Sequence, residues 1–168
     1  MREHKGFSLV ELMIVVAIIL VIAAIAIPNL LRARIAANDS SAAASMHAIN
    51  VAESGYFVTY NDVGFPLTIT ALTGPDPCTP SAASACLIDQ SLVAAGGKSG
   101  YTFAATGSAS PGSPFNDQFY ATGTPINNLT GSRAYCSVQD MTTRLQPAGN
   151  TTLVPSYATC LTLAAMSN

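Results

Sequence analysis

The chain contains no tryptophan, only two histidines and few charged residues. Charged side chains make up 10% of its 168 residues, compared with about 25% in a typical soluble protein. Seven Lys and Arg against nine Asp and Glu give a net charge of −2, which excludes nucleic-acid binding through a broad basic surface. A hydrophobic content of 49% also excludes a charged disordered chain. An ordinary cytosolic enzyme is disfavoured by the low charge density.

Motifs of common enzyme active sites are also missing. No Gly-rich phosphate loop, GxSxG or HExxH sequence occurs, and His47 has no nucleophile pattern near it. The sequence therefore predicts a protein that is not an enzyme and needs no cofactor. A calcium site at Asp62, Asp76 and Asp89 is a weakly supported alternative, because calcium requires several oxygen ligands and these acids are scattered along the sequence.

One long apolar run dominates the amino-terminal part of the chain. Residues 12–27 contain no polar side chain, and these 16 residues would span about 24 Å as a helix. Extending the run back to Phe7 gives 21 residues and about 32 Å, enough for a bilayer core of about 30 Å. The extension includes Glu11, and a carboxylate inside a membrane costs about 2.5–3.5 kcal/mol. This predicts a membrane helix with a functional acid near its amino end.

Two ordinary interpretations of this segment are a secretory signal peptide and a plain membrane anchor. Arg2 and Lys5 would form a charged n-region, and residues 24–26 resemble a small-residue cleavage site. Cleavage after Ala26 would release a secreted binding module. Against a signal peptide, the apolar run is long for an h-region and Glu11 interrupts its start.

A third interpretation rests on a short motif. A stretch reads KGFSLVE, ends at Glu11 and leads into the apolar run. It closely resembles the class III leader of type IV pilins and type II secretion pseudopilins, over about residues 5–35. The resemblance implies that residues 1–6 are a leader peptide, that a prepilin peptidase cuts between Gly6 and Phe7, and that Phe7 is then N-methylated.

The same resemblance gives Glu11 an assembly role. In filaments of this family the helices bundle with an axial stagger, so Glu11 of one subunit would meet the Phe7 amine of a neighbour. A charge pair in a low-dielectric core favours correct register over wrong register. The alternative is that Glu11 caps the helix start, where the macrodipole favours an acid.

Positive charges flank both ends of the apolar run, because Arg2 and Lys5 precede it and Arg32 and Arg34 follow it. The positive-inside rule therefore does not fix the orientation. The resemblance implies a cytoplasmic amino terminus, since family peptidases cut on that side. The precursor is expected in the bacterial inner membrane with its head outside, and the mature subunit in an extracellular filament.

Pro28 stands where the apolar run ends and is expected to kink the helix, because proline removes a backbone hydrogen bond. The helix is expected to continue, since the apolar side chains beyond Pro28 share one helix face. They are Ile35, Ala42, Met46, Ile49, Tyr56, Phe57 and Tyr60. Residues 7–27 would form the transmembrane and filament-core half, and residues 28–58 an amphipathic half packed on a head. Glu53 falls on the same face, and the pattern does not explain it.

Residues 59–168 are expected to form the globular head. Glycines and prolines make residues 59–98 loop-like, with one short helix near residues 84–95. Between turn signals in residues 99–146, strands are expected at 99–105, 117–123, 133–138 and 141–145. In the tail, residues 147–168, the stretch 156–163 would add an edge strand or pack against the sheet. The resulting fold class is α+β, a long helix on an antiparallel sheet of about four strands, which resembles the pilin roll.

Four cysteines in an exported chain suggest disulfides, and three pairings can be drawn. The first choice is Cys78–Cys86, which would close a short loop, with Cys136–Cys160 tying the tail to the sheet. A metal site is disfavoured because the spacings lack a CxxC pair and neither histidine is near. Major pilins often carry such a carboxy-terminal disulfide-bounded loop.

Taken with the resemblance, these features imply a structural subunit of a type IV pilus that serves motility, adhesion or DNA uptake. Its expected partners are identical subunits, the prepilin peptidase, an ATP-driven assembly platform and, before assembly, the membrane. A type II secretion pseudopilin, part of a periplasmic piston, is the alternative within the same family. The carboxy-terminal cysteine pair favours the pilin.

Overall fold

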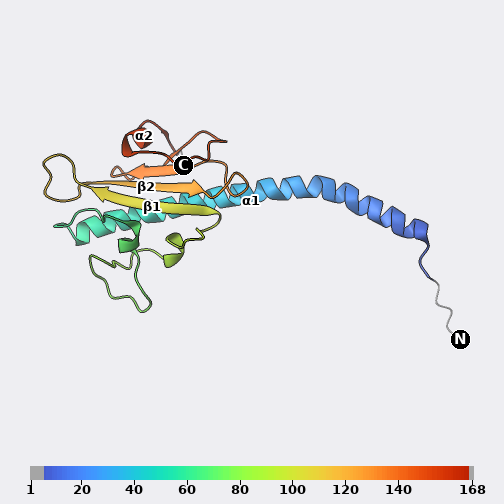
Figure 1. Ribbon diagram of the computed structural model, residues 1–168, viewed down its shortest axis with the longest axis horizontal. Coiled ribbons are helices and arrows are strands. Elements are labelled where there is room, and N and C mark those ends of the chain that lie inside the picture. Colours follow the sequence, from blue (N-terminus) through green and yellow to red (C-terminus); the bar gives the residue numbers. More distant parts are fainter. Residues whose placement is uncertain (1–5, 167–168) are drawn as a thin grey trace. The chain divides into compact units, whose positions relative to one another are not determined.

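A computed structural model of the chain describes residues 6–166. Most of the expected leader, including Arg2, His4 and Lys5, lies outside the described residues. The chain divides into two compact units, Met1–Arg34 and Ile35–Asn168 (Figure 1). Each is described by itself below.

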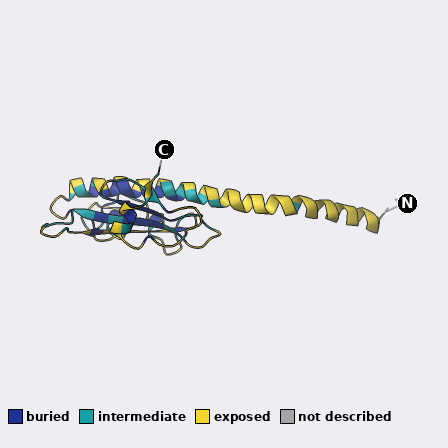
Figure 2. Ribbon diagram, turned by 90° about the horizontal axis from the view of Figure 1, so that it is seen from above, coloured by how far each residue is buried: buried dark blue, intermediate teal, exposed yellow. Residues whose placement is uncertain are grey.

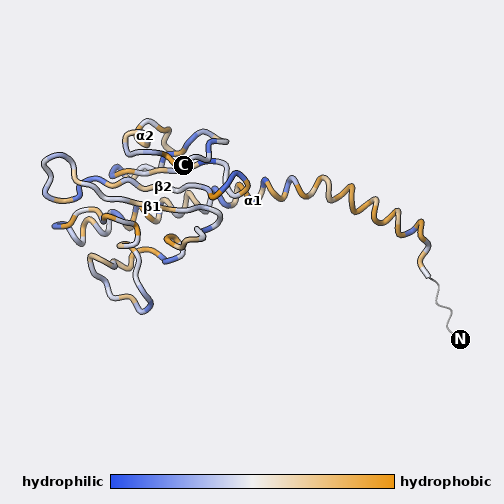
Figure 3. Tube along the Cα trace, viewed as in Figure 1, coloured by the Kyte–Doolittle hydropathy of each residue, from blue (hydrophilic) through white to orange (hydrophobic). Residues whose placement is uncertain are grey.

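The first unit consists of the amino-terminal half of helix α1, which spans Leu9–Thr59. Its side chains from residue 9 to 34 are exposed, apart from the half-buried Ala23 (Figure 2). Every residue from Leu12 to Ile27 is apolar, and the trace of this stretch is coloured as hydrophobic (Figure 3). Helical structure continues through Pro28, so the helix does not end where the apolar run ends. The kink expected at Pro28 stays a prediction.

In the second unit, the carboxy-terminal half of α1 packs on one face of a sheet (Figure 1). The sheet has five antiparallel strands in the order β1-β2-β3-β4-β5. The strands are β1 Tyr101–Ser108, β2 Gln118–Pro125, β3 Tyr135–Val138, β4 Arg144–Leu145 and β5 Ala164–Ala165. This confirms the α+β fold class, with one short strand more than expected.

The core between α1 and the sheet follows the predicted helix face. Ala42, Met46, Ile49 and Tyr56 are buried, and the alternation of strand β1 turns Phe103 and its like-facing neighbours toward them. Close packing favours glycine at position 123, because a Cβ there would lie 3.0 Å from Phe103 and 3.2 Å from Met46. The sequence pattern therefore identified the packing face correctly.

A second, smaller core lies on the other side of the sheet. Strand β3 is buried on both faces, so Tyr135 joins the core under α1 while Cys136 and Val138 join a cluster with Val154 and Cys160. Helix α2, Tyr157–Leu161, covers this cluster. The carboxy-terminal tail is thus part of the folded head.

The structure corrects the expectations for two short stretches. The helix near residues 84–95 is absent as such from the described chain: only 3₁₀ turns occur in this loop, η1 at Ile69–Leu72 and η2 at Gln90–Leu92. Cys86 has φ of 59°, a left-handed conformation that interrupts a helix. Of the two alternatives for the stretch 156–163, the edge strand is wrong and packing against the sheet is confirmed, since Cys160 and Leu163 join the second core. The stretch forms helix α2 because the Ser156 hydroxyl accepts a hydrogen bond from the Thr159 amide and caps a helix.

A polar network fastens the start of the packed half of α1 to the sheet. The Asp39 carboxylate accepts hydrogen bonds from the Tyr101 hydroxyl at 2.6 Å and from the amide of Ser132 at 2.9 Å. The Ser132 hydroxyl also donates to it. Burial, together with the hydrogen bond to Asp39, raises the pKa of Tyr101. The hydroxyl therefore stays a donor at any ordinary pH.

Replacing Asp39 with Ala should lower the free energy of unfolding by about 2–4 kcal/mol, because three donors lose their acceptor. Denaturant unfolding of the full chain in detergent would measure it. Ser40→Ala is the matched control, since the Ser40 hydroxyl is exposed and bonds only to the Ala36 carbonyl of its own helix. Equal stability of both variants would contradict a structural role for the network.

Candidate functional site

The predicted cleavage position lies just before α1. Gly6, Phe7 and Ser8 have no regular secondary structure, and the helix begins at Leu9. The Phe7 side chain is 92% exposed, and a Cβ at Gly6 would meet no atom within 4 Å. The peptide bond between Gly6 and Phe7 is therefore accessible to a protease.

Glu11 makes a local contact with the first turn of the helix. The Ser8 amide donates a hydrogen bond to Glu11 Oε2 at 2.9 Å, and the Val10 amide donates to Ser8 Oγ at 3.3 Å. Serine followed three residues later by glutamate is the capping-box spacing, a signal that the sequence analysis did not use. The capping alternative for Glu11 is thus realised within one chain, while the assembly role stays a prediction.

The apolar half of α1 offers a large surface without a partner in the described chain. Ile14, Ala17, Ile18, Val21 and Ile22 line a shallow groove along it, with no polar group in the lining. Within the described part of the chain, α1 is the one helix that is long and apolar enough to cross a membrane. A helix that is apolar all round needs lipid or other helices about it.

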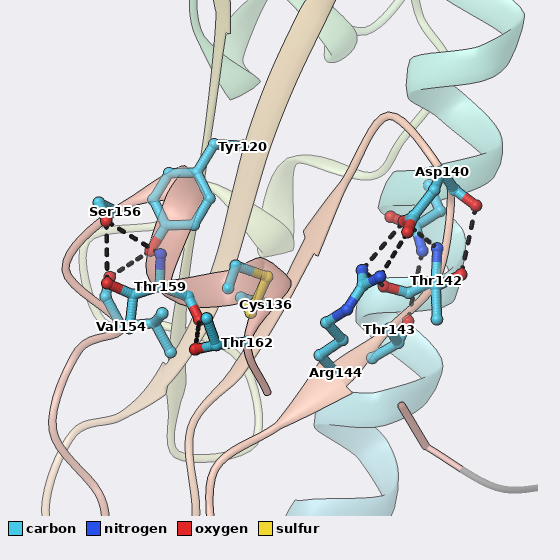
Figure 4. Close-up of a disulfide and its surroundings, with 12 residues drawn as sticks. Tyr120, Cys136, Asp140, Thr142, Thr143, Arg144, Val154, Ser156, Thr159 and Thr162 are labelled. Atoms are coloured by element: carbon cyan, nitrogen blue, oxygen red, sulfur yellow. Dashed lines mark hydrogen bonds and ion pairs between the residues drawn. A yellow bond between two sulfur atoms is a disulfide. The ribbon is translucent and has the colours of Figure 1, made fainter. Parts of the chain in front are cut away.

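Both cysteine pairs that the sequence analysis placed first are bonded in the structure. Cys78 and Cys86 are joined across the loop after α1, with their Cα atoms 6.1 Å apart. Cys136 of β3 and Cys160 of α2 are joined with Cα atoms 5.9 Å apart, and both are fully buried. The second bond attaches α2 to the sheet (Figure 4).

Polar contacts surround the Cys136–Cys160 bond (Figure 4). The Tyr120 hydroxyl donates to the Val154 carbonyl, and the Arg144 guanidinium donates to Asp140 Oδ1 at 3.0 Å. The hydrogen bond from Arg144 lowers the pKa of Asp140. The Tyr120 contact and the disulfide attach the tail to the sheet, and the Arg144–Asp140 pair connects the residues between β3 and β4.

Glu53 is a buried acid in the core of the head. The residue is fully buried on α1, and neither carboxylate oxygen has a hydrogen-bond partner within residues 6–166. Burial raises the pKa of Glu53 from 4.5 to about 8. The sequence placed Glu53 on the packing face but gave no reason for it, and the structure supplies no partner among the described residues.

The residues considered for metals or catalysis do not form a site in the described part of the chain. Residues 6–166 hold no group of three or more His, Cys, Asp or Glu able to bind a metal ion. The Asp89 carboxylate accepts from the Ser91 amide at 2.8 Å and caps η2, and His47 is exposed on α1. Asp76 lines a cavity in the loop beside the Cys78–Cys86 disulfide. Asp62 is not part of this cavity.

Comparison with known proteins agrees with the amino-terminal motif. A family model described as the prokaryotic N-terminal methylation motif matches residues 1–27. The chain is 62% identical over 40 residues to the type IV wide pilus major component PilA4 of Thermus thermophilus, covering 24% of this chain and 30% of that protein. It is 44% identical over 55 residues to the type IV major pilin protein PilA of Myxococcus xanthus, covering 33% of this chain and 25% of that protein. No solved structure matches.

An N-terminal methylation motif, an exposed apolar helix and a helix-on-sheet head are together the features expected of a prepilin-type protein. Among such proteins, the amino-terminal part of the chain is similar to two type IV pilins. Type IV pilins are structural subunits and not enzymes. The matched segment spans less than a third of the length of either relative.

Proposed function

We propose that this chain is a subunit of a type IV pilus, a helical surface filament built from identical copies. The observation that carries the proposal is the exposed apolar half of α1, which begins at Leu9 and lies within the matched methylation motif of residues 1–27. A soluble head attached to such a helix is stable either in a membrane or in a bundle of like helices. The filament supplies the second environment.

The proposed pathway begins with a precursor in the bacterial inner membrane, with the head on the outer side. The prepilin peptidase cuts between Gly6 and Phe7 and methylates the new amine of Phe7. Both residues precede the helix and are exposed, which suits a protease. An ATP-driven assembly platform then extracts the subunit from the bilayer.

In the filament, the apolar helices would pack against one another, with the heads on the surface. Burying one Leu or Ile side chain contributes about 1.5–3 kcal/mol, so many such contacts hold subunits without covalent links. Lipid already satisfies this burial in the membrane, and extraction therefore requires energy. Glu11 would exchange its bond to the Ser8 amide for the Phe7 amine of a neighbour.

The mass of the amino-terminal peptide of the mature protein tests the processing step. We expect it to begin at N-methylated Phe7, and a Gly6→Phe variant to keep the leader, because the peptidase requires a small residue before the cut. The accessible, non-helical position of Gly6 means that the variant should fold normally. A mature chain beginning at Ile27 would instead indicate a secreted module, without the filament helix.

A pseudopilin of type II secretion is the second candidate, since it shares the leader and the fold class. The similarity to two major pilins and the Cys136–Cys160 loop favour the pilus. Shearing intact cells separates the two: long filaments released into the medium indicate a pilus, whereas a subunit that stays in the envelope indicates the pseudopilin. Twitching, adhesion and DNA uptake would be assayed after that.

A further inference from the structure

A hollow of about 200 Å³ lies between α1 and the turn that joins β3 to β4. Its lining residues are His47, Met141, Thr142, Thr143 and Met166, and we name it the His–Met hollow. His47 and Met141 also line a second hollow farther along α1, so these two side chains border both spaces. The lining of the His–Met hollow contains no charged residue.

Hydrogen bonds hold the three segments around the His–Met hollow together. Asn50, three residues after His47 on α1, donates from Nδ2 to the Met141 carbonyl at 3.0 Å and to Thr143 Oγ1 at 3.3 Å. The turn that carries Thr143 thus lies against α1 (Figure 4). The Met166 amide donates to the Thr143 carbonyl at 2.9 Å, which continues the pairing of β4 with β5. An imidazole and two thioethers therefore reach one hollow from three separate segments of the chain.

Met141 has an unusual backbone conformation. Its φ is 57°, in the left-handed region that residues other than glycine seldom adopt. Such conformations gather at functional sites, where the surrounding structure holds them in place. Here the Met141 amide donates to the Val138 carbonyl at 2.9 Å, and its carbonyl accepts the bond from Asn50. Met141 and Met166 are both half-buried, packing on the core while they line the hollow.

The side chains of the lining are soft metal ligands. Thioether sulfur favours Cu(I), and imidazole nitrogen also binds copper. Zinc prefers thiolate, imidazole and carboxylate ligands, while calcium and magnesium require oxygen ligands. The hollow offers no carboxylate and no thiolate, and its only side-chain oxygens are the two threonine hydroxyls. A soft monovalent cation is therefore the ligand that suits all three side chains.

We propose that His47, Met141 and Met166 together bind one soft monovalent cation of the Cu(I) type in the His–Met hollow. The site differs from the His, Cys, Asp and Glu groups that residues 6–166 lack, because two of its three ligands are thioethers. It does not depend on filament formation, since all three residues belong to the Ile35–Asn168 unit. Methionine also fills irregular gaps in cores, but gap filling predicts no response to a metal ion.

Silver(I) is the probe, because it is a soft monovalent cation that keeps its oxidation state during a titration. The full-length chain in detergent would carry carbon-13 in its methionine methyl groups and be followed by NMR. We expect the first equivalent of Ag(I) to shift the methyl signals of Met141 and Met166 together. The signals of Met13 and Met46 should not move, because neither residue lines the hollow. Zn(II) at the same concentration should shift none of them.

Three variants test whether the ligands act as one site: His47→Gln, Met141→Leu and Met166→Leu. Leucine has nearly the volume of methionine and His47 is exposed, so the head should fold in all three. Removing the imidazole should weaken Ag(I) binding at both methionines by more than about tenfold, since even a group that only orients a metal ligand is worth about 10–100-fold in affinity. Each leucine variant should weaken binding at the remaining methionine to a similar extent.

Ser54→Ala is the matched control, because Ser54 is exposed on α1 and lines the second hollow but not the His–Met hollow. It should bind Ag(I) as the wild type does. A His47→Gln variant with unchanged affinity would mean that the thioethers bind silver independently, which overturns the site. Wild-type methyl signals that do not move with the first equivalent, or that respond equally to Zn(II), would overturn it as well.

Discussion

Replacing Glu11 with Ala should leave cleavage and methylation of Phe7 intact but reduce filament yield by on the order of a hundredfold, because one buried charge of a pair then has no partner. The change lies after the proposed cleavage position and outside the head. Filaments sheared from cells would be quantified against the mature subunit left in the membrane. The precursor-to-mature ratio reports processing separately.

Two further variants separate the charge of Glu11 from its capping contact. Glu11→Gln retains an acceptor for the Ser8 amide, as glutamine also serves in a capping box, but carries no charge. Ser8→Ala removes the reciprocal bond to the Val10 amide and keeps the charge. We expect the Gln variant to fail in assembly and the Ala variant to assemble. A Gln variant that assembles normally would mean that Glu11 acts as a helix cap and not through its charge in register selection.

The sequence predicted the elements with a long repeating pattern. The amphipathic face of α1 could be read because its apolar residues recur over many turns, and Met46, Ile49 and Tyr56 are indeed buried. Strands β1 and β2 have eight residues each, so their positions were close to those expected. Strand β1 begins at Tyr101 and not at Ser99, because Ser99 and Gly100 have φ of 51° and 75° and form a turn.

Short elements could not be predicted in the same way. Strand β5 has two residues and depends on pairing with β4, a contact that no local pattern encodes. Helix α2 has five residues and depends on its Ser156 cap and on the Cys136–Cys160 bond. For the candidate site, the Ser8–Glu11 capping spacing was present in the sequence and was overlooked. The burial of Glu53 was visible only as a polar residue on an apolar face.

Glu53 makes the stability of the head depend on pH. The folded head keeps the Glu53 carboxyl protonated up to its raised pKa of about 8, whereas the unfolded chain releases the proton near the ordinary 4.5. The folded state therefore binds more protons between these two values, and its stability falls as pH rises through this window. The loss amounts to about 3–5 kcal/mol above pH 8 and is absent below pH 4.5.

Glu53→Gln should abolish this dependence, because the amide has nearly the same shape and does not titrate. Unfolding of the full-length chain in detergent, measured at pH 4.5, 6.5 and 8.5, should show a falling stability for the wild type that the Gln variant lacks. Asp62→Asn is the matched control, since Asp62 is exposed and its removal should leave the slope unchanged. A wild-type slope that survives in the Gln variant would mean that other groups cause it and that water or a partner stabilises the Glu53 carboxylate. If the fall of stability with pH is lost in Glu53→Gln and kept in Asp62→Asn, Glu53 is the group that destabilises the head at alkaline pH. Glu53 is the one acid in the described core that is buried and has no hydrogen-bond partner.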